Sequence, residues 1–322
     1  HKTATSSIQT GLFRMRDHLS AQNVFFPLLP SPDFVPIPNH SAFLYSLFAD
    51  QPENYHINIG QGLTTASDVT TLNSQYEEYF RTAIAPFQRD ITIFSGEDMI
   101  LLSEGGLARL RAFLVEHFGP DNIVKVIYYL RTPHEWFASL VLQWVRGGWV
   151  LDDLYDKNVP NIRVKLEPFV RQFGPQNILI AKFEEAIAHP NGPVGHLLSL
   201  VSDKIAIPDS AAAIENRGLC AEAVNLVSAL NKIARSAEGT ASIGVQRDYL
   251  APFLRLRGTR FVLPKPVQER AWRSAQESLA WIEATFGIDT YKKFEYQDQP
   301  TPMWAEEAIT SIAALIAERI HP

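Results

Sequence analysis

Hydrophobic positions follow two alternating patterns over the first 190 residues. Short apolar runs rich in β-branched and aromatic residues predict buried strands at 23–27, 89–98, 122–130 and 177–183. Between these runs, apolar residues recur at helical spacing over ten residues or more. Beyond about residue 190 only the helical pattern continues.

This alternation predicts an α/β protein with a central parallel sheet flanked by helices, because parallel strands need a crossover helix between them. We expect one domain over 1–322, with an α/β core in 1–190 and a mainly helical part in 191–322. The first helix carries one apolar stripe, formed by Ile8, Leu12, Met15 and Leu19. It should therefore begin near Thr5 or Ser6.

Charge and cysteine content narrow the class of protein. With 29 Lys and Arg against 35 Asp and Glu, the formal net charge is −6, which does not favour a nucleic-acid partner. Cys220 is the only cysteine, so an internal disulfide is impossible and a reducing, cytoplasmic location is expected. We expect no transmembrane segment and see no signal peptide, and the oligomeric state is left open.

The segment KTATSS (2–7) leads into the first helix and includes its expected start. The free N–H groups of a helix start bind anions, and here Lys2 adds a charge while hydroxyl groups add neutral donors. An ordinary N-cap at Thr5 or Ser6 is the simpler interpretation. The glycines of the GxxxxGK[ST] phosphate loop are missing.

A second polar segment follows the strand at 122–130. Arg131 comes directly after the strand, Pro133 suits the first turn of the next helix, and Ser139 lies in the second turn. An arginine fork and a hydroxyl suit a phosphate monoester. A structural arginine beside an unremarkable serine is the alternative.

Taken together, KTATSSIQ (2–9) and RTPHEWFAS (131–139) resemble the two binding segments of sulfotransferases that use 3′-phosphoadenosine 5′-phosphosulfate (PAPS), which read roughly KTGTTSIQ and R-x-P-x-x-x-x-x-S. NILIAKFEEA is similar to a later strand-then-Glu segment of that family, and ENRGLCAEAVNLVSALN to a stretch common in bacterial members. Ala4 replaces the usual loop glycine. The strand expected before His1 is not in the sequence, and RLRGTR (255–260) is a loose counterpart of the family's basic-Gly loop.

The resemblance implies a P-loop-like sulfotransferase fold. It also implies an enzyme that transfers a sulfuryl group from PAPS to a hydroxyl or amine of an acceptor. The acceptor would be a small molecule or a glycan, which can be lipid-linked. PAP (adenosine 3′,5′-bisphosphate) would be the product, and no metal is needed. It implies that the 5′-phosphosulfate contacts the loop residues Lys2, Thr3, Ala4, Thr5, Ser6 and Ser7. For the 3′-phosphate it implies Arg131, Ser139, Arg257 and Gly258. Lys2 would also neutralise the leaving phosphate.

Two residues compete for the role of the base that takes the acceptor's proton. Glu97 comes directly after the strand residues ITIFSG (91–96), at the rim where the sulfuryl group should point, and is preferred. His40 stands at a helix start after a Pro-rich segment and needs less tuning of its pKa. A nucleotide-dependent kinase and a non-catalytic nucleotide-binding module remain alternative functions.

Overall fold

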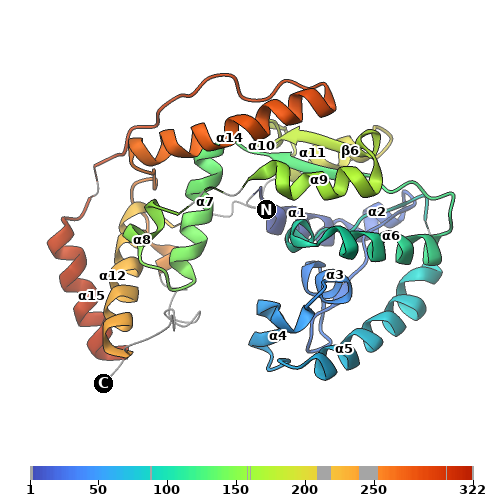
Figure 1. The fold of residues 1–322 in the computed structure, drawn as a ribbon, viewed down its shortest axis with the longest axis horizontal. Coiled ribbons are helices and arrows are strands. Elements are labelled where there is room, and N and C mark those ends of the chain that lie inside the picture. Colours follow the sequence, from blue (N-terminus) through green and yellow to red (C-terminus); the bar gives the residue numbers. More distant parts are fainter. Residues whose placement is uncertain are drawn as a thin grey trace. The chain divides into compact units, whose positions relative to one another are not determined.

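The structure is a computed structural model that describes residues 3–87, 89–157, 159, 161–208, 219–238, 253–301 and 303–320. The chain divides into two units (Figure 1). The first unit comprises residues 1–130 and 163–215, and the second comprises 131–162 and 216–322. The units therefore do not divide at residue 190: the segment 131–162 belongs with the C-terminal helices, and 163–215 belongs with the N-terminal part.

The first unit contains the parallel strands that the apolar runs predict. Strand β1 (Val24–Phe25) pairs with β4 (Ile91–Thr92), and β5 (Val126–Leu130) pairs with β6 (Ile178–Lys182), both in parallel. The α/β class is thereby confirmed. One central sheet is not formed in the described residues, where the strands make separate two-stranded sheets. The third of these was not expected: in the Pro-rich segment, β2 (Leu29–Pro30) and β3 (Pro36–Ile37) pair antiparallel.

Helices surround these strands in the first unit, and residues of both parallel pairs share one hydrophobic core with the stripe of the first helix. All four residues of that stripe are buried. Gly11 of the first helix lies so close to Val194 that a Cβ would overlap its side chain, which explains the small residue. The helices are α1 (Thr5–Arg14), α2 (Arg16–Ser20), α3 (Ser41–Phe48), α4 (His56–Gly60), α5 (Ala66–Tyr79), α6 (Glu104–Phe118), α9 (Ile162–Phe173, its first residue in the second unit), α10 (Phe183–Ala188) and α11 (Gly192–Val201).

The second unit is helical. Figure 1 shows α12 (Ala221–Glu238) beside α15 (Glu306–Ile320), and α7 (Pro133–Arg146) packs on both α12 and α14 (Lys265–Phe286). The short α8 (Leu151–Tyr155) follows α7. The buried Asn231 holds the end of α7 and the connection to α8 by donating to the carbonyls of Val145 and Trp149 at 2.8 and 2.9 Å. The residues described beyond 190 form no strand longer than an isolated bridge between Cys220 and Arg260.

Candidate functional site

The first described residues form the loop that leads into α1. The helix begins at Thr5, as expected, and Ala4 before it has the left-handed backbone conformation, with φ 57° and ψ 27°. The first hydrogen bond of the helix runs from the Ile8 N–H to the Ala4 carbonyl at 2.9 Å. The N–H groups of residues 5–7 therefore do not take part in the hydrogen bonds within the helix. No side chain caps this end, which makes the N-cap interpretation of Thr5 or Ser6 wrong. The end of the helix dipole here suits an anion.

The hydroxyl groups of this loop differ in accessibility. Thr3 and Ser7 are buried, Thr5 is half-buried, and Ser6 is exposed. Lys2 lies outside the described residues. Of the predicted 5′-phosphosulfate contacts, Ser6 is therefore the hydroxyl most open to a ligand.

The start of α1 is tied to the loop that follows β4. The buried Gln9 donates from Nε2 to the Ser95 carbonyl at 2.9 Å and to Asn39 Oδ1 at 3.3 Å. Asn39 in turn accepts from the Ser41 N–H at 3.0 Å, at the start of α3. Three segments far apart in sequence thus meet here: the helix after KTATSS, the Pro-rich segment's end and the polar cluster at 95–98.

His40 lies at the centre of this junction and is fully buried. Its Nδ1 accepts from the Ser95 N–H at 3.0 Å, which leaves Nε2 as the protonated nitrogen that donates to the Pro27 carbonyl at 2.8 Å. Burial lowers the pKa of His40 to about 4, against the smaller opposing effect of the Pro27 bond. Both ring nitrogens form hydrogen bonds to backbone groups. His40 is therefore a structural residue and is no longer a candidate for the base.

Glu97, the preferred candidate for the base, comes two residues after Ser95 in the chain. It opens a 3₁₀ turn (Glu97–Leu101) and is half-buried. The residue before it, Gly96, lies against the start of α3, where a Cβ would be 3.0 Å from the Ser41 nitrogen. This close backbone approach fixes the direction in which the chain leaves β4 and enters the turn that Glu97 opens.

Sequence reasoning missed the neighbouring pair of Asp98 and Tyr55. Both are buried, and the Tyr55 hydroxyl donates to Asp98 Oδ2 at 2.6 Å. Burial, followed by the Asp98 charge, raises the pKa of Tyr55 above its ordinary value, so the phenol stays a donor. The Glu-Asp doublet is visible in the sequence, but nothing near it indicates a tyrosine partner 43 positions away.

The second predicted segment lies in the second unit. Arg131 precedes α7, Pro133 occupies its first turn, and Ser139 is half-buried in its second. Glu135 lies midway between Arg131 and Ser139 in the sequence. Glu135 and Ser139 are four residues apart and share one face of α7, while Arg131 lies before the first residue of the helix. Glu135 is the residue that the motif does not predict, because positions between its fixed residues are read as variable.

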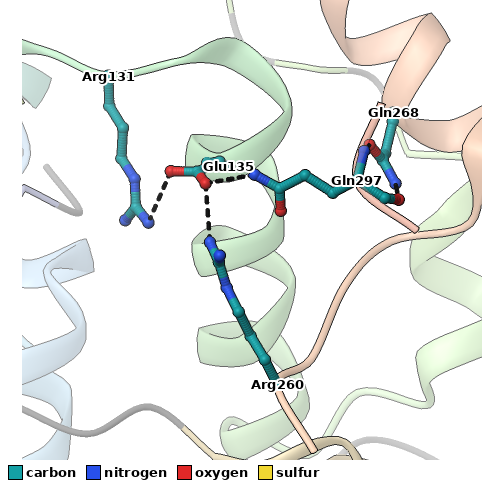
Figure 2. Close-up of polar contacts among 5 residues, drawn as sticks. All are labelled: Arg131, Glu135, Arg260, Gln268 and Gln297. Carbon is teal, nitrogen blue, oxygen red and sulfur yellow. Dashed lines mark hydrogen bonds and ion pairs between the residues drawn. The ribbon is translucent and has the colours of Figure 1, made fainter. Parts of the chain in front are cut away.

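Glu135 gathers donors from three parts of this unit (Figure 2). Its Oε1 accepts from Gln297 Nε2 at 2.6 Å and from Arg260 Nη2 at 2.7 Å, while its Oε2 lies 3.6 Å from Arg131 Nη2. Burial acts to raise the pKa of Glu135, but the bonds from Gln297 and Arg260 and the two guanidinium charges outweigh it. The pKa therefore lies below its ordinary value, and Glu135 is a carboxylate.

Gln297 is itself held in place by Gln268, which is buried. Gln268 Nε2 donates to the Gln297 carbonyl at 2.7 Å, and its Oε1 accepts from the Gln297 N–H at 3.0 Å (Figure 2). The same Nε2 donates to the Leu263 carbonyl at 2.7 Å. The backbone at 297 is thus fixed independently of its side chain.

The 255–260 segment contributes Arg260 to this arrangement. Arg257 and Gly258, which the resemblance implied for the 3′-phosphate, are exposed. Gly258 passes against the carboxylate of Glu222, which a Cβ would overlap. Glu222 is buried and accepts from the N–H and hydroxyl of Thr259, both at 2.9 Å, so the glycine has a packing reason.

Each unit therefore contains one group of candidate residues. The first unit joins the start of α1 to the cluster at 95–98, and the second joins Arg131, Glu135 and Arg260. Across the described ranges, no group of three or more His, Cys, Asp or Glu residues could hold a metal ion. In the same part of the chain, no helix is both long and apolar enough to cross a bilayer. No protein-family model, curated protein or solved structure matches the chain.

Proposed function

We propose that this chain is a PAPS-dependent sulfotransferase that transfers a sulfuryl group to a hydroxyl or amine acceptor. The observation that carries the proposal is the pairing of two motif-like segments, KTATSSIQ and RTPHEWFAS, with two helix starts. The helix after the first has donors and no side-chain cap, and Arg131 stands directly before the second. Both features suit phosphate groups.

In this proposal each segment binds one end of the donor. Residues 3–7 contact the 5′-phosphosulfate through backbone N–H groups and hydroxyls, and Lys2 neutralises the phosphate that leaves. Arg131 and Ser139 bind the 3′-phosphate. Arg260 takes the place of Arg257 as the basic residue of the 255–260 segment, since it shares Glu135 with Arg131.

The reaction is an in-line displacement at sulfur. The acceptor oxygen or nitrogen forms a bond to sulfur as the bond between sulfur and the phosphate oxygen breaks, and the acceptor's proton passes to Glu97. Most of the rate enhancement comes from positioning and from stabilising charge on the leaving phosphate, so no metal is required. Glu97 is the remaining candidate base because both nitrogens of His40 are occupied.

A kinase or a non-catalytic nucleotide-binding module would bind differently. A kinase of this class needs the GK[ST] loop, which is absent from the opening segment, and an Asp for magnesium. The test is a calorimetric titration of the full chain with adenosine 3′,5′-bisphosphate and, separately, with ATP and magnesium. Preference for the bisphosphate supports a sulfotransferase; preference for ATP with magnesium supports a kinase, and binding of neither overturns the proposal.

The acceptor is proposed only as a class: a hydroxyl or amine on a small molecule or glycan, with or without a lipid. Acceptors are screened by transfer of radiolabelled sulfate from PAPS to saccharides, lipid-linked saccharides, phenols and small amines. A Glu97→Gln protein serves as the control, because true turnover at this site should fall in that variant while background transfer should not.

A further inference from the structure

Asp98 in the first unit is a buried carboxylate that uses only one of its two oxygens. It is 6% exposed, and its Oδ2 accepts from the Tyr55 hydroxyl at 2.6 Å. Among the residues that the structure describes, none donates to Oδ1, and no Lys, Arg or His pairs with the carboxylate. Oδ1 is not fully enclosed by protein atoms, so a ligand can reach it. Because buried charges are normally hydrogen-bonded, this oxygen suits a donor from outside the chain.

The orientation of this carboxylate is fixed from two sides. The Asp98 N–H donates to Ser41 Oγ at 3.3 Å, at the start of α3. On the other side Tyr55, which holds Oδ2, is itself buried and packs its ring against that of Tyr45, with the centroids 4.5 Å apart. Oδ1 therefore keeps one direction, as a binding group does that is oriented before its ligand arrives.

Glu97 brings a second carboxylate close to the first. Burial raises the pKa of Tyr55 most, and the charges of Asp98 and Glu97 both raise it further. Both carboxylates therefore lie near the Tyr55 hydroxyl. Since Glu97 is the proposed base, Asp98 lies where the acceptor would bind.

Two neighbouring carboxylates favour one kind of acceptor. They repel an anionic acceptor, and they would keep an amine in its protonated form, which has no lone pair for the attack. A phenol has one hydroxyl and can donate to one carboxylate only. Adjacent hydroxyls of a saccharide ring are two neutral donors. One can lose its proton to Glu97 as its oxygen attacks sulfur, while the other donates to Asp98.

We infer that Asp98 is an acceptor-binding residue that selects a neutral polyol, a saccharide with a hydroxyl next to the one that receives the sulfuryl group. Its Oδ1 accepts a hydrogen bond from that neighbouring hydroxyl, and Tyr55 is a positioning residue that holds Oδ2. The inference rests on the proposed function, because it assumes that Glu97 takes the acceptor's proton.

The experiment compares the cis and trans isomers of 1,2-cyclohexanediol with cyclohexanol, which lacks the neighbouring hydroxyl. Transfer of radiolabelled sulfate from PAPS by the full chain gives kcat/KM for each probe, and phenol and benzylamine are assayed beside them. The better diol should exceed cyclohexanol by roughly tenfold or more, as expected for one hydrogen bond to a charged group. Asp98→Asn should remove most of this preference.

Asp98→Asn is a mild change, because asparagine keeps the shape of the side chain and an oxygen that can accept from Tyr55. Its affinity for adenosine 3′,5′-bisphosphate should equal that of the wild type, which shows that the first unit is folded. Tyr55→Phe should lower the preference for the diol as well, because Asp98 loses the group that orients it, and should also keep the bisphosphate affinity.

Asp50 offers a matched control in the same part of the unit. Burial, followed by the charges of Asp98 and Asp50, raises the pKa of Tyr45, so both acids lie near that tyrosine. Asp50 already accepts from Arg109 Nη2 at 2.6 Å, in an ion pair. Asp50→Asn should therefore leave the ratio of diol to cyclohexanol unchanged.

Failure of this inference differs from failure of the proposed function. Equal values for the diols and cyclohexanol, an unchanged ratio in Asp98→Asn, or a preference for phenol or benzylamine would overturn the inference alone, since sulfate is still transferred. Binding of the bisphosphate without transfer to any probe would also overturn it and leave the donor site standing. A chain that neither binds the bisphosphate nor transfers sulfate contradicts the proposed function, and the inference fails with it.

Discussion

The buried histidine at the junction of the first unit should make that unit sensitive to acid. His40 has a folded-state pKa of about 4 against an ordinary value of 6.5, because burial disfavours the charged ring. Between these values the unfolded chain binds a proton that the folded chain does not, so stability falls as the pH falls from 6.5 to 4. The difference of about 2.5 pKa units corresponds to about 3 kcal/mol of unfolding free energy.

The assay compares the wild type with His40→Gln, since other groups titrate in the same range and cancel in the difference. All six tryptophans lie in the second unit, so tryptophan fluorescence would not follow the first unit. Urea unfolding is therefore followed by far-ultraviolet circular dichroism at pH 7, 6, 5 and 4. The wild type should lose about 3 kcal/mol more than the variant over this range. ¹⁵N spectra of the imidazole should show a neutral ring protonated on Nε2 at pH 5.5. A His40 that titrates near 6.5, or equal losses in the two proteins, would refute the reasoning.

Four further substitutions test the first unit and the chemistry assigned to it. Ala4→Gly should stabilise the protein by about 0.5–1 kcal/mol in urea unfolding, because Ala4 has a left-handed backbone that glycine adopts without strain; a loss of stability would contradict that conformation. Gly96→Ala should destabilise by roughly 1–3 kcal/mol, since its Cβ would press on the Ser41 backbone, and a neutral effect would show that the close approach is not needed. Glu97→Gln should lose about 10²–10⁴-fold in turnover with normal bisphosphate binding, and retained turnover would rule Glu97 out as the base. Lys2→Ala should lower turnover more than donor affinity, as expected for a charge that acts on the leaving phosphate; equal losses would make it a binding residue only.

The elements that local pattern decides were predicted well. The start of α1 at Thr5 and the burial of its four-residue stripe follow from spacing within a few turns. The same holds for β5, which ends at Leu130, and for α7, which begins at Pro133. In each case the residues that set the boundary of the element are neighbours in the chain, so the boundary can be predicted from a single sequence.

The features that depend on distant residues were not predictable. Gln297 and Glu135 are 162 positions apart, and Ser95 and His40 are 55 apart, with no repeat or spacing to link them. The role of His40 shows the consequence: its position suggested a base, while its burial and two backbone partners make it structural. The division into units also depends on packing, because α7 contacts α12 and α14.

The most direct test of the central proposal is a ³¹P spectrum of adenosine 3′,5′-bisphosphate bound to the full chain, which resolves the two phosphates. The proposal assigns the 5′-phosphate to residues 3–7 and the 3′-phosphate to Arg131. With excess ligand, Ser6→Ala should change the bound shift of the 5′-phosphate alone, and Arg131→Ala that of the 3′-phosphate alone. Bound shifts that neither substitution changes, or the opposite assignment of the two phosphates, would contradict it.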